Sequence, residues 1–136
     1  MWFERTRTIR FHHCDPAAII FYPQYFVLFH ELLEEWFTDG LGTPYGEYIR
    51  VARLGVPAVK AECEFFTQCG LGDAVRFRLQ PTRLGTSSLG YTGEAWGGEE
   101  LRARAAITVV QMSLETRRSV PFAPDLRARI EAFLAP

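Results

Sequence analysis

The spacing of hydrophobic and polar positions changes along the chain and divides it into a helical part and a part made of strands. Residues 2 to 12 alternate imperfectly and predict a first strand. From Pro23 to about Thr38, apolar residues recur at helical spacing in two stripes and leave only a narrow polar edge. Proline suits the first turn of a helix, where its missing N–H is not needed. Gly40 and Gly42 predict the end of this helix. A helix that is apolar over most of its circumference has to be wrapped by other parts of the protein.

After Gly55 the period changes to two, which is typical of strands with one buried face. Segments 57–69, 74–85, 86–96 and 100–113 each show this alternation, and we expect four strands in a meander. Residues 43–55 predict a short helix and a loop, and residues 123–135 predict a short amphipathic helix. The order indicates an α+β fold in which an antiparallel five-stranded sheet curls around one long central helix. One such sheet cannot enclose the helix completely, so we expect at least a dimer.

Composition narrows the possible classes of protein. The 136 residues contain no repeat or linker and predict a single domain, 1–136. A net charge of −1 gives no reason to expect nucleic acid or an anionic membrane as a partner. No apolar run approaches the ~20 residues of a membrane span, and the first residues lack the pattern of a signal peptide. Three cysteines without a C-x-x-C pair indicate free thiols and a cytoplasmic protein.

Several kinds of chemistry are disfavoured by spacing. His12, His13, Cys14 and Asp15 are all metal-ligand types, but consecutive residues of an extended chain point to opposite sides. No second cluster supplies further ligands, so no metal site is predicted. The sequence GTSSLG is not a serine nucleophile elbow, and GLGTPYG fits no phosphate-binding loop.

Asp15, at the start of the apolar segment, has two interpretations. Asp-Pro commonly starts a turn, so the carboxylate could serve only the local backbone. Alternatively, the carboxylate could act as nucleophile or general base beside the N–H groups of the helix N-terminus, which could polarise a carbonyl. The spacing alone leaves both interpretations open.

The segment 11–26, FHHCDPAAIIFYPQYF, resembles the signature of the 4-hydroxybenzoyl-CoA thioesterase family, hotdog-fold enzymes that hydrolyse acyl-CoA thioesters. The shared elements are Cys-Asp-Pro-Ala at 14–17, Phe-Tyr-Pro at 21–23 and Tyr25. The resemblance continues more weakly through Gly55, Pro57, Val59, Gly72-Asp73 and RLGTSSL at 83–89. It therefore covers nearly the whole chain, and it implies a hotdog fold.

The resemblance also implies roles for residues. Asp15 matches the catalytic carboxylate, which attacks the thioester carbonyl or activates water. The backbone N–H of Tyr22 matches the donor that polarises this carbonyl, and no cofactor takes part. Two subunits pair their sheets edge to edge and form active sites between them, often within a homotetramer (a dimer of dimers). Activity is expected to fall as the pH drops through the pKa of the carboxylate.

The chain departs from the family pattern at three positions. His13 stands where the family often has another acid, and Ala18 replaces a common glycine. His30 falls where the hydroxybenzoyl enzyme has a carboxylate for the phenol of its substrate, so the acyl group could differ. Either an aryl or a short or medium acyl chain is possible. The predicted substrate-binding residues are Phe26, Phe29, His30 and Val59.

Arginine suits the phosphates of coenzyme A. The predicted CoA-binding residues are Arg83, Ser87, Arg117 and Arg118. Two other functions are compatible with the same fold. One is an enoyl-CoA hydratase or dehydratase that uses His12, His13 or His30, and the other is a non-catalytic acyl-CoA-binding module.

Overall fold

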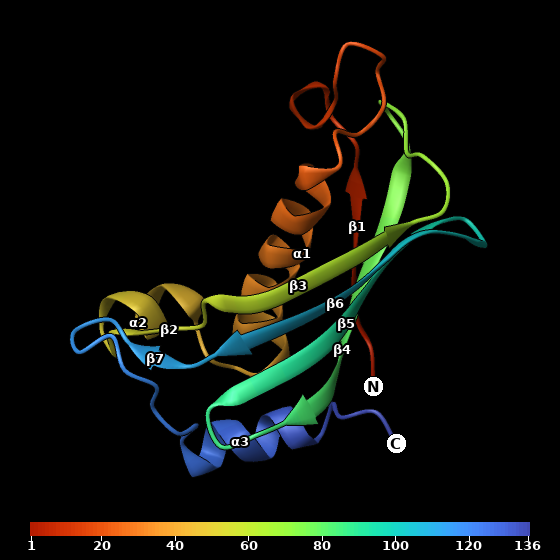
Figure 1. Cartoon of the computed structure of the whole chain (residues 1–136). Helices are drawn as coiled ribbons and strands as arrows, with labels where there is room; N and C mark the ends of the chain where they lie inside the picture. Colours follow the sequence, from red (N-terminus) through yellow and green to blue (C-terminus); the bar gives the residue numbers. More distant parts are fainter.

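A computed structural model describes all 136 residues, and its centre is one antiparallel sheet of five strands (Figure 1). The strand order across the sheet is β1-β4-β5-β6-β3. The strands are β1 (Phe3–Thr8), β3 (Ala58–Phe65), β4 (Ala74–Leu84), β5 (Ser88–Gly97) and β6 (Glu100–Val110). Together with the helix described next, this sheet confirms the predicted α+β class.

The expected meander of four strands is wrong in one respect. Strands β4, β5 and β6 are neighbours in sequence and in space, but β3 pairs with β6 at the far edge, from Ala58 opposite Val109 to Phe65 opposite Ala103. The chain between β3 and β4 is too long for a tight hairpin and crosses one end of the sheet instead. There the N–H of Ile9, just after β1, donates to the Asp73 carbonyl at 2.9 Å. Alternation identifies a strand and its faces, but not its neighbour.

Helix α1 (Pro23–Glu35) lies across one face of the sheet (Figure 1). It begins at the predicted proline and continues as a π-helical turn, Trp36–Gly40. A Cβ at Gly40 would lie 2.5 Å from Trp36 Cδ1, so the turn can close only with glycine at this position. The predicted end of the helix near Gly40 is therefore correct.

The side of the sheet that faces α1 forms the core. The inward residues of β4 are Val75, Phe77 and Leu79, as the alternation predicts, and the arginines between them point outward. Phe29 of α1 is fully buried and packs edge-on against Phe77, with ring centroids 5.5 Å apart. A Cβ at Gly93 would lie 2.7 Å from this ring, so the missing side chain of Gly93 lets the helix approach β5.

Smaller elements close the two ends of the molecule. The first strand stops earlier than expected, because Phe11–His13 forms a 3-10 turn. The other elements are α2 (Tyr45–Arg50), β2 (Leu54–Gly55), β7 (Met112–Ser113) and α3 (Pro124–Glu131). Segment 9–22 and the β3–β4 connection lie together at one end of the sheet, and α3 lies near the other (Figure 1). None of the helices combines the length and the apolar character needed to cross a bilayer.

Candidate active site

Asp15 lies in a short hairpin that leads into α1. The N–H of Asp15 donates to the Ile19 carbonyl at 3.0 Å, and the N–H of Phe21 donates to the His13 carbonyl at 2.9 Å. Cys14 and Ile20 are paired between these two contacts. The hairpin therefore carries the chain from Asp15 back to the start of the helix within seven residues.

The Asp15 carboxylate has one local hydrogen bond and one free oxygen. Oδ1 accepts the N–H of Ala17 at 2.9 Å, whereas Oδ2 receives no hydrogen bond from the chain. The side chain is half-buried. The turn interpretation of Asp15 is thus correct, but it uses only half of the carboxylate. The second oxygen is available to attack a carbonyl or to accept a proton from water.

Ala18 occupies the tip of the hairpin in a left-handed conformation, with φ = 60°. Alanine pays a steric penalty in this region that glycine avoids, because its Cβ approaches the backbone oxygen. The Ala18 carbonyl accepts the N–H of Leu71 at 2.9 Å, which attaches the tip to the β3–β4 connection. Ala18, which replaces a common glycine of the family, therefore stands at a position where glycine would be unstrained.

The backbone N–H of Tyr22 is unpaired at the N-terminus of α1. Pro23 has no N–H to offer, while Gln24 and Tyr25 donate theirs to the carbonyls of Phe21 and Tyr22. No acceptor within the chain receives the N–H of Tyr22 itself. The partial positive charge of the helix N-terminus adds to this donor, so a carbonyl oxygen placed here would be polarised.

A cavity of about 310 Å³ opens between the hairpin, the first turn of α1 and the end of β3. Its lining residues are Ile19, Ile20, Tyr22, Tyr25, Phe65, Phe66, Thr67 and Gln68. Phe65 packs against both tyrosines, with ring centroids 6.0 Å from Tyr22 and 5.4 Å from Tyr25. The hydroxyl of Tyr25 donates to Cys69 Sγ at 3.3 Å, and burial raises the pKa of Tyr25 far above its ordinary value, so this wall stays neutral.

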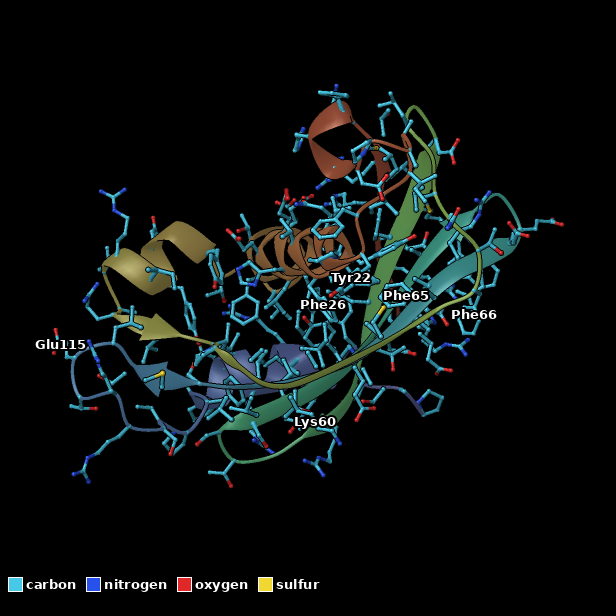
Figure 2. The ribbon with its side chains drawn as sticks, turned by 45° about the horizontal axis from the view of Figure 1, so that its top comes forward. Tyr22, Phe26, Lys60, Phe65, Phe66 and Glu115 are labelled. Carbon is cyan, nitrogen blue, oxygen red and sulfur yellow. The ribbon has the colours of Figure 1, made fainter.

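Figure 2 shows Tyr22, Phe26 and Phe65 close together at this end of α1, whereas Lys60 lies on the side of β3 that faces away from α1. Phe26 is half-buried and adjoins the cavity without lining it. Asp15 itself is not in the wall. It lies directly across the hairpin from Ile19, which is in the wall. Of the predicted site residues, the structure therefore brings Asp15, Tyr22 and Phe26 to one end of α1.

Three predicted substrate-binding residues lie elsewhere. Phe29 is fully buried beneath Gly93, so in this fold it supports the core and does not line the cavity, contrary to expectation. His30 is exposed on α1 and pairs with Glu34 at 3.2 Å. Val59, which is 63% exposed, lies six residues from Phe65 along β3, a separation of about 20 Å.

The four predicted CoA-binding residues gather at the opposite end of the sheet. Arg83 and Ser87 flank the turn between β4 and β5, and the N–H of Ser113, in β7, donates to the Arg118 carbonyl at 2.9 Å. Arg117 precedes Arg118 in the same exposed turn. Strand β4 spans about 33 Å from the hairpin end to this end. Within one subunit these residues are therefore remote from Asp15.

The histidines and cysteines near the hairpin show no arrangement for a metal. No group of three or more histidine, cysteine, aspartate or glutamate side chains is placed to hold an ion. Cys14, Cys63 and Cys69 are all free. Burial raises the pKa of Cys63 to about 11, which keeps its thiol protonated near neutral pH.

Comparison with known families identifies the class of protein. The family profile of the Thioesterase-like superfamily matches residues 9–130. This chain belongs to that superfamily. The match confirms the predicted family and the predicted class of enzyme, a thioesterase.

Individual relatives agree with this membership. A 1,4-dihydroxy-2-naphthoyl-CoA hydrolase from Thermosynechococcus vestitus is 29% identical over 131 residues, which cover 93% of this chain and 86% of the relative. Among solved structures, a 1,4-dihydroxy-2-naphthoyl-CoA thioesterase from Synechocystis superposes with a TM-score of 0.85 at 23% identity, covering 96% of each chain. A gentisyl-coenzyme A thioesterase superposes with a TM-score of 0.86 at 24% identity and covers 93% of this chain and 98% of its own. The two structures confirm the hotdog fold.

Sequence reasoning missed one wall of the cavity. The residues from Phe65 to Gln68 come from the end of β3 and the start of the connection, which the alternation placed in an ordinary half-buried strand. One signal was available. Phe65 and Phe66 are adjacent, so their rings point to opposite sides of the strand and cannot both lie on its buried face.

Proposed function

We propose that this thioesterase hydrolyses acyl-CoA thioesters at the hairpin end of α1, with Asp15 as nucleophile or general base. One observation carries the proposal: a free carboxylate oxygen on Asp15 and an unpaired N–H on Tyr22 flank the two ends of one hairpin beside an apolar cavity. A nucleophile and an oxyanion donor at the mouth of an apolar pocket are the two groups that acyl transfer requires.

The chemistry follows from these two groups. The thioester carbonyl oxygen binds the Tyr22 N–H, and the helix dipole stabilises the negative charge that develops on it. Asp15 either attacks the carbonyl carbon, releasing the CoA thiolate and leaving an anhydride that water hydrolyses, or deprotonates a water that attacks. Both routes consume one water and yield the free acid and CoA. Neither route requires a metal or another cofactor.

The cavity favours an aromatic acyl group. A dry cavity of about 150 Å³ holds a benzene ring, so about 310 Å³ accommodates one ring with its carbonyl or two fused rings. The rings of Tyr22, Tyr25 and Phe65 offer edges and faces for offset or edge-on contact. The relatives named for naphthoyl-CoA and gentisyl-CoA act on aromatic acyl groups, which agrees with this lining.

The outer edge of β3 supports a homodimer. This strand has no neighbour beyond it, and nearly all of its residues are exposed, including Val59 and the aromatic Phe65. An edge strand leaves a row of unpaired N–H and C=O groups that can pair with a second chain, and here apolar residues alternate with the charged Lys60, Glu62 and Glu64. Antiparallel pairing of β3 with a second copy brings the Ala58 end of one strand beside the Phe65 end of the other. The partner's Val59 then approaches the cavity.

The same pairing gives the arginines a role. Val109 of β6 lies opposite Ala58, so the end of the sheet that carries Arg117 and Arg118 moves toward the partner's cavity. Arg83, Ser87 and these two residues then bind the phosphates of the CoA held by the partner subunit. His30 remains a candidate for substrate contact in the assembly, with Glu34 orienting its ring. Sedimentation tests the arrangement: a mass near 15.5 kDa would exclude it, and twice or four times that mass would identify a dimer or the homotetramer.

We propose a cytoplasmic location, because free thiols persist in a reducing compartment, and we expect no nucleic-acid or membrane partner, because the net charge is −1. Localisation of the tagged chain by cell fractionation tests this placement.

The decisive experiment measures CoA release from benzoyl, 4-hydroxybenzoyl, phenylacetyl, hexanoyl and crotonyl esters. Asp15→Asn is expected to lower kcat by about 10²- to 10⁴-fold, while Glu99→Gln, an exposed carboxylate at the β5–β6 turn, has no effect. Tight binding by the wild type without turnover would instead indicate a binding module. Loss of enoyl absorbance from crotonyl-CoA without thiol release would indicate a hydratase.

A further inference from the structure

His13 is a buried ionisable residue in the hairpin that the proposed chemistry does not use. It is only 6% exposed, and its ring stacks at a tilt on that of His12, with centroids 4.0 Å apart. Nδ1 of His13 accepts the backbone N–H of Arg10 at 2.8 Å. In return, the backbone N–H of His13 donates to the Arg10 carbonyl at 3.0 Å, which closes the turn Phe11–His13.

The backbone of His13 also reaches the other arm of the hairpin. Its carbonyl accepts the N–H of Phe21 at 2.9 Å, and Phe21 immediately precedes Tyr22. Asp15 follows two residues after His13. His13 therefore links three parts of the site: the turn Phe11–His13, the segment that carries the Asp15 carboxylate, and Phe21, the neighbour of the Tyr22 N–H.

The contact with Arg10 depends on the charge of the ring. Nδ1 can accept a hydrogen bond only in the neutral tautomer that carries its proton on Nε2, because imidazolium has no free lone pair. Burial and the neighbouring charges of His12 and Arg10 lower the pKa of His13 below its ordinary value of 6.5, while Glu31 of α1 opposes them. The remaining ionisable groups of the hairpin are Asp15 and Cys14, whose thiol donates to the Arg10 carbonyl at 3.4 Å, and on the β3–β4 connection Asp73 Oδ2 accepts the N–H of Gly70. Near neutral pH the accepting tautomer is therefore present.

We propose that His13 is a positioning residue: by accepting the Arg10 N–H and the Phe21 N–H, it holds the Asp15 carboxylate in register with the Tyr22 N–H. This inference rests on the proposed thioesterase function. Protonation of the ring removes the first contact, the turn Phe11–His13 loosens, and the carboxylate loses its placement. Misplacement of a catalytic group by about 1 Å can lower the rate about a hundredfold.

Two substitutions separate this role from simple packing. His13→Leu fills the same space without an acceptor, whereas His13→Asn can offer its carboxamide oxygen to the Arg10 N–H and does not titrate. We expect His13→Leu to lower kcat by about tenfold to a hundredfold with little change in KM. We expect His13→Asn to restore most of that loss. Glu99→Gln, at the exposed β5–β6 turn and remote from the hairpin, serves as the control and should match the wild type.

The pH profile of kcat provides the second readout. In the wild type, protonation of His13 releases the Arg10 N–H, so kcat should fall by about tenfold to a hundredfold as the pH drops through the lowered pKa of His13. In His13→Asn this step should be absent, and kcat should stay closer to its value at neutral pH over the same range. A structural role alone would lower thermal stability without moving this profile.

The outcomes distinguish the two hypotheses. If the wild type hydrolyses no ester of the panel, the proposed function fails, and the role of His13 falls with it. If the wild type is active and a folded His13→Leu variant keeps its kcat, or if His13→Asn leaves the acid limb unchanged, the positioning role is wrong while the thioesterase stands. Should His13→Leu not fold, the pH profile of His13→Asn alone decides.

Discussion

Two carboxylates, Asp15 in the hairpin at one end of the sheet and Glu94 on the sheet's outer face, have very different surroundings. Glu94 lies on β5, on the face away from α1, and is only 4% exposed. Its Oε1 accepts hydrogen bonds from Arg78 Nε at 2.8 Å and Trp96 Nε1 at 3.0 Å, and its Oε2 accepts two from Arg104 at 2.9 and 3.0 Å. Asp15 accepts one hydrogen bond and has no donor at its second oxygen.

The difference teaches what distinguishes a structural carboxylate from a reactive one. Every lone-pair direction of Glu94 is directed at a donor, and Arg78 is further held over the ring of Trp2, 4.0 Å from its centroid. Such a group stabilises the fold but has no capacity left for a substrate. Asp15 contributes less to the fold and keeps an oxygen free for chemistry.

The largest expected contrast is in activity. Asp15→Asn should lower kcat by about 10²- to 10⁴-fold. Glu94→Gln should leave the activity per folded molecule unchanged, because Glu94 lies on the face of the sheet away from the cavity. Active-site titration with a slow ester analogue would give the concentration of folded enzyme. A fall in kcat of Glu94→Gln comparable to that of Asp15→Asn would show that the two regions do not act separately.

Stability should show the reverse contrast. Glu94→Gln replaces an acceptor of four hydrogen bonds by a group with one carbonyl oxygen, leaves Arg104 without its anion and leaves Arg78 only the longer pair with Glu4, at 3.7 Å. Removing one partner of a buried ion pair costs 3–5 kcal/mol, but Arg104 is half-exposed and regains water, so we expect a loss of about 2 kcal/mol. Asp15→Asn should change the free energy of unfolding little, since an amide oxygen can still accept the Ala17 N–H. Urea unfolding at one fixed protein concentration measures both, with Glu99→Gln as an exposed control.

The pH dependence of unfolding sharpens this second contrast. Burial alone would raise the pKa of Glu94, but hydrogen bonds from Trp96, Arg78 and Arg104 outweigh it and hold the pKa below the ordinary 4.5. Its stabilisation is therefore complete above pH 4.5 and is lost as the pH falls through the lowered value in the folded state. The stability difference between wild type and Glu94→Gln should narrow over that range. A constant difference down to pH 3 would contradict the ionic role of Glu94. The pKa of His13 is also lowered, but His13 contributes equally to the stability of both proteins, so its effect cancels in the difference.

Much of the fold could be predicted, because it depends on local signals. Pro23 marks the start of α1, and alternation identifies the inward residues of β4 and β6. The order of the strands could not be predicted, because pairing of β3 with β6 is a contact between distant segments to which period-two alternation is indifferent. The buried state of Glu94 escaped prediction for the same reason: the pattern places it on the outer face, and only the arginines of two neighbouring strands bury it there.

The candidate site likewise has one part that could be predicted from the sequence and one part that could not. The hairpin and the start of the helix are contiguous in sequence, so Asp15 and Tyr22 could be named together. The opposite wall at Phe65 depends on where β3 lies, and it was missed. Phe29 was misplaced because its spacing on α1 is compatible with either a pocket or the core, and only the missing side chain of Gly93 decides between them.

The smallest expected effect concerns backbone strain, which the hairpin carries at Ala18. Ala18→Gly should relieve the steric penalty of a left-handed alanine, of order 1 kcal/mol, but glycine gains entropy in the unfolded chain, so a net stabilisation of about 0.5 kcal/mol is expected. Ala17→Gly, one residue earlier and not at positive φ, meets only the entropic effect and should destabilise by about 0.5–1 kcal/mol. Urea midpoints of the two variants should therefore move in opposite directions from the wild type. If both variants lose stability equally, Ala18 is unstrained, and the hairpin is held no more tightly than an ordinary turn.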